Sequence, residues 1–303
     1  MKLTRPAPYT PPAPADGAAA PPPQTDRERQ AVAGALAGVR RAAAAPGPVR
    51  LSVVMPFYKR LSDLRRVLPL QVRHLARADL EVVLSLDEPS EERGVIELLR
   101  ANPQVKWRVL VNDHDHPWRP PCCAINVGVR HAAGDLVLVV SPESAFVGDV
   151  PGEALAAQRA EPGAVIAGRV VFATFDELLS GTVEQTFHKH HERGNRYYGS
   201  ICAPRSAFQA VGGYDESFVH WGGDDDNLRR RLELLGLPLF TDDDLCVLHL
   251  SDQRRGGPWG HRNPNHHTEP RQKKRAFAPV TPFVNPGGWG EAFQRVALDW
   301  QRP

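Results

Sequence analysis

Four short runs of mainly apolar residues alternate with helical stretches between residues 49 and 140, and this alternation constrains the fold more than any other feature. The runs are Leu51–Met55, Leu80–Leu86, Trp107–Val111 and Leu136–Val140. Such strands are typical of a parallel sheet that is covered on both faces. Helices between them are predicted by the helical spacing of Leu61, Leu64, Val67, Leu68 and Val72 and by the segment Pro121–Ala133. The sequence therefore predicts an α/β fold with a doubly wound, Rossmann-like, mostly parallel sheet.

Polar residues follow each of these strands directly. They are Pro56–Arg60, Asp87–Glu88, Asn112–Asp113 and Ser141–Glu143. In doubly wound sheets the ligand lies outside the carboxyl ends of the strands. We therefore expect these four segments to form one binding edge.

The rest of the chain divides by composition into a tail, a short helix and a C-terminal extension. Residues 1–24 are rich in proline and alanine and are expected to be a disordered tail. In residues 25–48, Thr25 and Glu28 have capping-box spacing, which predicts a short helix that docks on the main domain, followed by a linker. Residues 49–250 are expected to form a single domain. Residues 251–303 are expected to form a lid or extension, with Arg254, Arg255, Arg271 and Lys273 as candidate phosphate contacts or, equally, as a solvated basic loop.

The overall charge excludes some classes of partner. Thirty-seven basic and 35 acidic residues give a formal net charge of +2, so no global field attracts nucleic acid. The four cysteines form neither a C-x-x-C pair nor a regular framework, which favours a reducing compartment. No apolar run approaches the roughly 20 residues that span a bilayer. We therefore expect a cytoplasmic protein without a transmembrane segment.

Two glycine-rich segments near the end of the main domain carry the most specific signal. They are Gly212-Gly-Tyr-Asp-Glu216 and Trp221-Gly-Gly-Asp-Asp-Asp-Asn-Leu228. Together with Leu51–Arg60 they resemble the GT-A fold glycosyltransferases, especially family 2 and the related galactosyl- and N-acetylgalactosaminyl-transferases. The resemblance covers roughly residues 49–250, which it identifies as a GT-A catalytic domain.

The resemblance implies a role for each residue of the second segment. Asp225 matches the catalytic base, which removes the proton of the acceptor hydroxyl. Asp224 replaces the family's Glu, which usually contacts the acceptor or donor sugar. Trp221, Gly222 and Gly223 would form the tight turn beside it, which lets the sugar approach closely. Three acids at a helix start can instead be an exposed capping cluster.

The resemblance also implies a nucleotide pocket at the predicted binding edge. Pro56, Phe57 and Tyr58 would line the base and ribose pocket, and Arg60, at the end of the same segment, is a further candidate for substrate binding. Asp87 would accept the imide N–H of uracil, although an Asp after a strand is often a turn or helix cap. Asn126, in the segment Ala124–Gly128, would shape the donor site.

A divalent metal, Mn²⁺ or Mg²⁺, is implied by the same family, but the motif is incomplete. Ser141-Pro142-Glu143 stands where the family has Asp-x-Asp. Glu143 and His249 would be the remaining protein ligands, with diphosphate and water completing the coordination. The alternative is a related protein that has lost activity.

These inferences lead to one function and leave alternatives open. We expect an inverting transferase that moves a hexose or N-acetylhexosamine from a nucleotide sugar, with UDP as the favoured carrier, to an acceptor hydroxyl. The alternative is a catalytically impaired nucleotide-sugar-binding protein; a hydrolase would leave the nucleotide pocket unexplained. The acceptor stays open among glycan, lipid, peptide and small metabolite. The cluster of His188, His190 and His191 has no assigned role.

Overall fold

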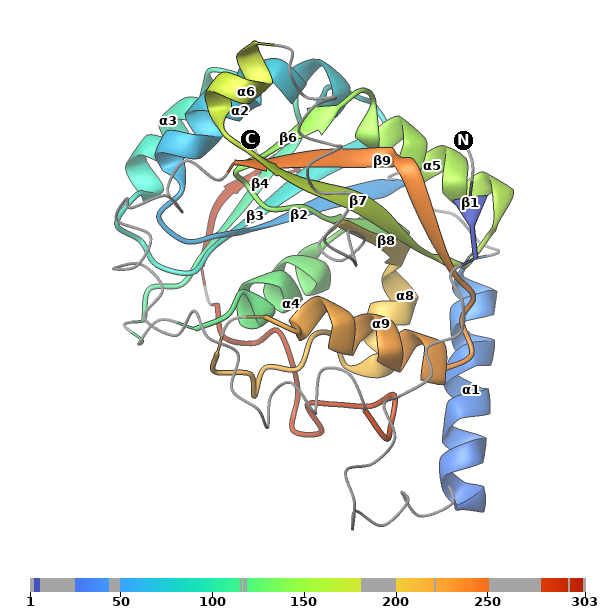
Figure 1. The fold of residues 1–303 in the computed structure, drawn as a ribbon. Helices are drawn as coiled ribbons and strands as arrows, with labels where there is room; N and C mark the ends of the chain where they lie inside the picture. Colours follow the sequence, from blue (N-terminus) through green and yellow to red (C-terminus); the bar gives the residue numbers. More distant parts are fainter. Residues whose placement is uncertain are drawn as a thin grey trace, which may run out of the picture.

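One mixed sheet runs through the middle of the protein (Figure 1). The computed structural model describes residues 3–5, 25–43, 50–114, 116, 119–180, 200–220, 222–250, 279–293 and 295–301. Within these residues the sheet has ten strands in the order β1-β9-β7-β8-β5-β2-β3-β4-β10, with β6 paired to β9.

The predicted parallel strands form the centre of this sheet. They are β2 (Leu51–Phe57), β3 (Leu80–Leu86), β4 (Trp107–Val111) and β5 (Leu136–Val139). β2 pairs in parallel with β3 and with β5, and β3 pairs in parallel with β4. All four expected strands are present, and the α/β prediction is confirmed.

The outer strands are mostly antiparallel and come from later in the chain. They are β6 (Ser144–Val147), β7 (Val165–Ala173), β8 (Ser200–Pro204), β9 (Leu239–Leu250) and β10 (Arg295–Asp299). β8 joins β5 to β7, and β10 pairs with β4. β7 and β9 are parallel, so the sheet mixes both pairings.

Helices cover both faces of the sheet (Figure 1). One face carries α2 (Leu61–Leu75), α3 (Glu92–Arg100), α5 (Val150–Ala160) and the short α6 (Phe175–Leu179). The other carries α4 (Cys122–His131), α8 (Arg205–Val211) and α9 (Asp224–Leu234).

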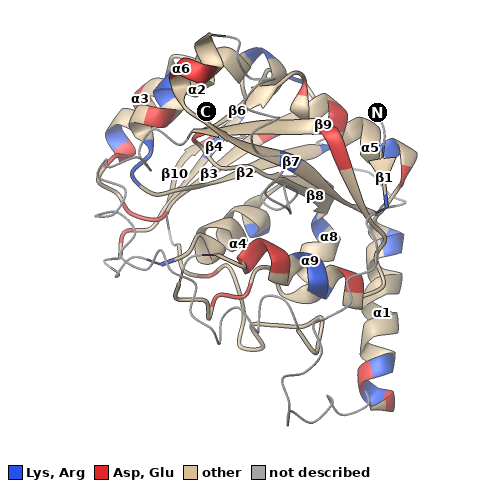
Figure 2. Cartoon of the chain, viewed as in Figure 1, with Lys and Arg blue, Asp and Glu red and all other residues tan. Residues whose placement is uncertain are grey.

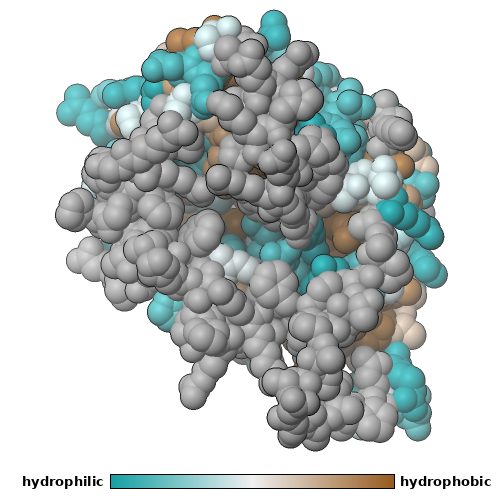
Figure 3. All heavy atoms as spheres, in the orientation of Figure 1, coloured by the Kyte–Doolittle hydropathy of each residue, from teal (hydrophilic) through white to brown (hydrophobic). Residues whose placement is uncertain are grey.

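Strand alternation divides the core between the two faces. In β2, Leu51, Val53, Met55 and Phe57 pack in the cluster that contains the α2 and α3 side chains, whereas Val54 packs in the cluster with α4. The described residues visible in Figure 3 are mainly hydrophilic, with small apolar areas between them. The apolar side chains are therefore gathered in the two layers between sheet and helices.

The N-terminal region confirms one expectation and corrects another. α1 (Asp26–Ala43) begins with the predicted capping box: the Glu28 N–H donates to Thr25 Oγ1 at 3.2 Å, and the Thr25 N–H donates to Glu28 Oε2 at 2.7 Å. Its Val39 is buried in the core cluster of α8 and α9. The expectation of a disordered tail is wrong for Leu3 and Thr4, which form β1 on the edge of β9, because strand pairing at an edge needs little apolar burial.

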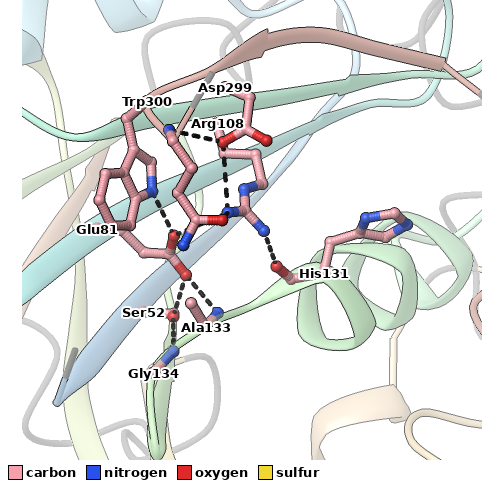
Figure 4. Close-up of polar contacts among 9 residues, drawn as sticks. Ser52, Glu81, Arg108, His131, Ala133, Gly134, Asp299 and Trp300 are labelled. Carbon is pink, nitrogen blue, oxygen red and sulfur yellow. Dashed lines mark hydrogen bonds and ion pairs between the residues drawn. The ribbon is translucent and has the colours of Figure 1, made fainter. Parts of the chain in front are cut away.

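A buried polar network ties the start of the parallel strands to the end of the chain (Figure 4). Glu81 is fully buried and accepts hydrogen bonds from Ser52 Oγ at 2.7 Å and from the Trp300 indole N–H at 2.7 Å. Arg108 lies 3.7 Å from Glu81 Oε2 and 3.4 Å from Asp299 Oδ1. The segment after β10 is therefore part of the folded domain.

No helix within the described ranges is long and apolar enough to cross a bilayer.

Candidate functional site

The carboxyl ends of β2, β3 and β4 lie together, as the sequence predicts. The Asp87 N–H donates to the Phe57 carbonyl at 2.8 Å, and the Asn112 N–H donates to the Leu86 carbonyl at 2.9 Å. Pro56 and Tyr58 are half-buried at this edge. Phe57 was expected to line a nucleotide pocket, and this expectation is wrong: the side chain is 1 % exposed and packs in the core, on the same strand face as Met55.

Asp87 is buried in a cluster of donors. Its carboxylate accepts from Arg119 in bidentate fashion, with Nε to Oδ2 at 3.1 Å and NH2 to Oδ1 at 2.6 Å. His116 Nε2 lies 3.4 Å from Oδ1. Burial raises the pKa of Asp87, but the hydrogen bonds from His116 and Arg119 outweigh burial and hold the pKa below its ordinary value. Asp87 is therefore an ionised carboxylate, and each of its oxygens accepts one hydrogen bond from Arg119 and can accept another.

Arg119 and His116 were not found by the sequence analysis. Neither residue belongs to a motif. His116 and Arg119 lie 29 and 32 positions after Asp87 in the sequence. Arg119 keeps a quarter of its side chain exposed, so the guanidinium lies between the buried Asp87 and solvent.

Glu143 and His249 meet because β6 and β9 pair antiparallel with Ser144 opposite His249. His249 Nε2 is 3.2 Å from Glu143 Oε1, and Arg60 NH2 is 3.3 Å from the same oxygen. Burial opposes ionisation of Glu143, but Arg60 and His249 together hold its pKa far below the ordinary range. Two of the predicted site residues, His249 and Arg60, therefore contact the same oxygen of the third, Glu143.

This pair fits part of a divalent site. Two neighbouring ligands of an octahedral cation, each about 2.1 Å from it, are separated by about 3 Å, which is close to the observed 3.2 Å. Among the described residues no group of three or more His, Cys, Asp or Glu side chains could hold a metal ion. Substrate oxygens and water would have to supply the remaining ligands, as Mg²⁺ usually requires.

The acidic cluster Asp224–Asp226 forms the first turn of α9 (Figure 2). Gly222 and Gly223 have φ of +92° and +86°, a conformation that favours glycine and explains both residues. Asp224 and Asp225 are half-buried behind this turn. Burial, and for Asp225 also the charge of Asp224, raises the pKa of both carboxyls above the ordinary value.

Asn126 does not face the donor site, which corrects its predicted substrate-binding role. The side chain is fully buried, and its Nδ2 donates to the Tyr214 carbonyl at 2.8 Å and to Glu216 Oε1 at 2.9 Å. Its Oδ1 accepts from the Tyr214 N–H at 2.7 Å. Both amide hydrogens and the oxygen are thus used to hold the segment of residues 212–218, which we call the acceptor loop.

Residues 279–293 also hold the acceptor loop. Asn285 Nδ2 donates to the carbonyls of Gly212 and Tyr214, both at 2.7 Å. The Gly290 N–H donates to Glu216 Oε1 at 2.7 Å. This part of the expected C-terminal extension is therefore built into the site.

Several predicted residues lie outside the described ranges. They are Trp221, His188, His190, His191, Arg254, Arg255, Arg271 and Lys273.

A comparison with known families matches residues 182–243, which contain the acceptor loop and the acidic cluster, to the family described as the N-terminal domain of galactosyltransferase. Among solved structures, the chain is similar to the mannosyltransferase PcManGT from Pyrobaculum calidifontis in complex with GDP-Man and Mn²⁺. The identity is 17%, the TM-score is 0.50, and the match covers 78% of this chain and 69% of that one. The chain has a GT-A glycosyltransferase fold.

Two further solved structures match the chain with lower TM-scores. The Drosophila beta1,4-galactosyltransferase 7 catalytic domain in complex with xylobiose has 14% identity, a TM-score of 0.48 and coverage of 75% of this chain and 79% of that one. S. aureus TarS 1–349 in complex with UDP has 13% identity, a TM-score of 0.49 and coverage of 76% and 70%. No curated protein sequence matches the chain. The matched family segment and the fold together indicate a glycosyltransferase.

Proposed function

We propose that this protein is an inverting glycosyltransferase that moves a hexose or N-acetylhexosamine from a UDP-sugar to an acceptor hydroxyl. The observation that carries the proposal is Asp225, a half-buried carboxylate in the first turn of α9 whose pKa is raised by burial and by Asp224. A base with a raised pKa accepts a proton more readily from an attacking hydroxyl. The match of residues 182–243 to the family described as the N-terminal domain of galactosyltransferase supports the reaction class.

In the proposed reaction the acceptor oxygen attacks the anomeric carbon while its proton passes to the Asp225 carboxylate. The bond between the anomeric carbon and the diphosphate oxygen breaks, and the nucleoside diphosphate leaves from the opposite face. Asp224 would contact a sugar hydroxyl beside the base. Arg60, which lies 3.3 Å from Glu143, would offer a cation to the departing diphosphate.

The nucleotide would lie at the carboxyl ends of β2 and β3. Pro56 and Tyr58 are half-buried there, and the Asp87–Arg119 pair supplies both acceptor and donor groups for the edge of a base. Glu143 and His249 would hold Mn²⁺ or Mg²⁺ together with the donor diphosphate. When bound, such an ion neutralises charge on the departing diphosphate.

The proposal is tested by incubating the protein with individual nucleotide sugars and Mn²⁺ and measuring nucleoside diphosphate release. We expect release that Asp225→Asn reduces by at least about 100-fold, the usual contribution of a general base. Glu97→Gln, which also neutralises an acid but at an exposed position of α3, is the matched control. Turnover that survives Asp225→Asn would exclude the base assignment.

A second candidate is a nucleotide-sugar-binding protein with impaired catalysis. It is favoured by Ser141 in place of the first acid of the metal motif and by the contact of Arg60 with Glu143. This candidate predicts tight UDP binding by calorimetry that is indifferent to EDTA, with no diphosphate release from any donor. The assay with individual nucleotide sugars therefore distinguishes the two functions, because only the transferase releases nucleoside diphosphate.

A further inference from the structure

Tyr214 connects the acceptor loop to the proposed base. Its side chain is fully buried, and its hydroxyl donates a hydrogen bond to Asp225 Oδ1 at 3.0 Å. A buried tyrosine hydroxyl needs such a partner, and a bond to a charged acceptor is stronger than one between neutral groups. The contact joins residues 11 positions apart, on the loop before α9 and on α9 itself.

The backbone of Tyr214 is fixed on both sides. Its N–H donates to Asn126 Oδ1 at 2.7 Å, and its carbonyl accepts from Asn126 Nδ2 at 2.8 Å and from Asn285 Nδ2 at 2.7 Å. Gly213 has φ of +69°, and a Cβ there would clash with Asn126 Oδ1. Asn126 on α4 and Asn285 in residues 279–293 therefore hold the Tyr214 backbone in the position from which its hydroxyl reaches α9.

We infer that Tyr214 is a positioning residue for the reaction: its hydroxyl holds Asp225 Oδ1 in place and stabilises the ionised carboxylate that receives the acceptor proton. This inference rests on the proposed function of Asp225. Tyr214 would act on the reaction only through its hydrogen bond to Asp225.

The groups around Asp225 decide whether loss of the Tyr214 hydroxyl raises or lowers the pKa of Asp225. On α9 these are Asp224, Asp226 and Arg229; the acceptor loop supplies Tyr214, and α4 supplies Cys122. Burial and the neighbouring acids raise the pKa of Asp225, whereas the Tyr214 hydrogen bond and Arg229 lower it. Without the Tyr214 hydroxyl, the pKa of Asp225 rises further, and less of the base is ionised at a given pH.

The test compares Tyr214→Phe and Asp224→Asn with the unchanged protein in pH profiles of kcat/KM for diphosphate release. In Tyr214→Phe we expect the acidic limb to move to higher pH, with the rate on that limb falling roughly tenfold more than the rate on the plateau. In Asp224→Asn the limb should move to lower pH, because a like charge is removed. A purely structural role would lower the plateau of Tyr214→Phe and leave its limb in place, and that result would overturn the inference.

A second measurement is independent of turnover. The Asp225 carboxyl carbon can be titrated by NMR in ¹³C-labelled protein and assigned through its absence in Asp225→Asn. A higher Asp225 pKa in Tyr214→Phe supports the inference, and an unchanged one overturns it. If instead Asp225→Asn keeps full turnover, the proposed function fails while the NMR titration still decides the role of Tyr214.

Loss of folding in Tyr214→Phe would be recognised by circular dichroism. In that case a ring-fluorinated tyrosine at position 214 keeps the shape of the side chain and makes the hydroxyl a stronger donor. The acidic limb and the NMR titration should then move to lower pH. No movement, or movement in the other direction, would contradict the inference.

Discussion

Replacing Arg60 with glutamine tests how the incomplete metal site works. Arg60 NH2 is 3.3 Å from Glu143 Oε1, and the two side chains are only 15% and 7% exposed. At an effective dielectric constant of about 20, two unit charges at this distance attract by about 5 kcal/mol. A divalent cation at Glu143 competes with this attraction. Arg60 also lies 3.2 Å from Asp63 Oδ2, a neighbour that limits how much of the attraction is lost when Arg60 moves.

We therefore expect Arg60→Gln to bind Mn²⁺ at least about tenfold more tightly, which corresponds to about 1.4 kcal/mol. The same change should weaken UDP binding in EDTA, because a cation near the diphosphate is removed. Calorimetric titrations of Mn²⁺ and of UDP with EDTA measure the two effects separately.

The matched control is Arg93→Gln, which removes one positive charge at an exposed position of α3 paired with Glu97. It should leave both affinities unchanged. The reasoning is refuted if Arg60→Gln and the control bind Mn²⁺ equally, since Arg60 and the metal would then not compete for Glu143. Weaker Mn²⁺ binding in Arg60→Gln would refute it as well.

Three further predictions concern stability, measured by urea unfolding. Glu81→Leu should lower the free energy of unfolding by about 3 kcal/mol, because it leaves the Ser52 hydroxyl and the Trp300 indole N–H without their acceptor and takes from Arg108 one of its two carboxylate neighbours; unchanged stability would contradict the role of the network in Figure 4. Gly223→Ala should cost about 1 kcal/mol, since φ of +86° is strained for alanine, and a neutral result would exclude that conformation. Glu143 has a lowered pKa in the folded state, so its stabilising contribution should be complete above the ordinary carboxyl pKa and disappear as the pH falls below it; Glu143→Gln should flatten this acid-side dependence.

Local patterns predicted the parallel strands and α1, because burial on both faces and end capping leave a direct trace in the sequence. The same patterns could have corrected one error. Phe57 continues the alternation of Val53 and Met55, so strand geometry places it in the core even though a binding loop follows immediately.

Other features of the site depend on contacts between distant segments and leave no local trace. Arg119 reaches Asp87 only after β3, β4 and the start of α4 are folded together. Asn285 reaches Tyr214 across 71 positions. The position of a single arginine or asparagine in a loop does not indicate which distant residue it contacts. Such pairs are therefore identified only from the three-dimensional structure.

The two halves of the proposed site are joined through α4 and the residues just before it. Arg119, ahead of the helix, holds Asp87 on the nucleotide side. Asn126, one turn into the helix, holds Tyr214, and Tyr214 holds Asp225 on the acceptor side. The same short stretch of chain, residues 119–126, therefore fixes the Asp87 carboxylate directly and the Asp225 carboxylate through Tyr214.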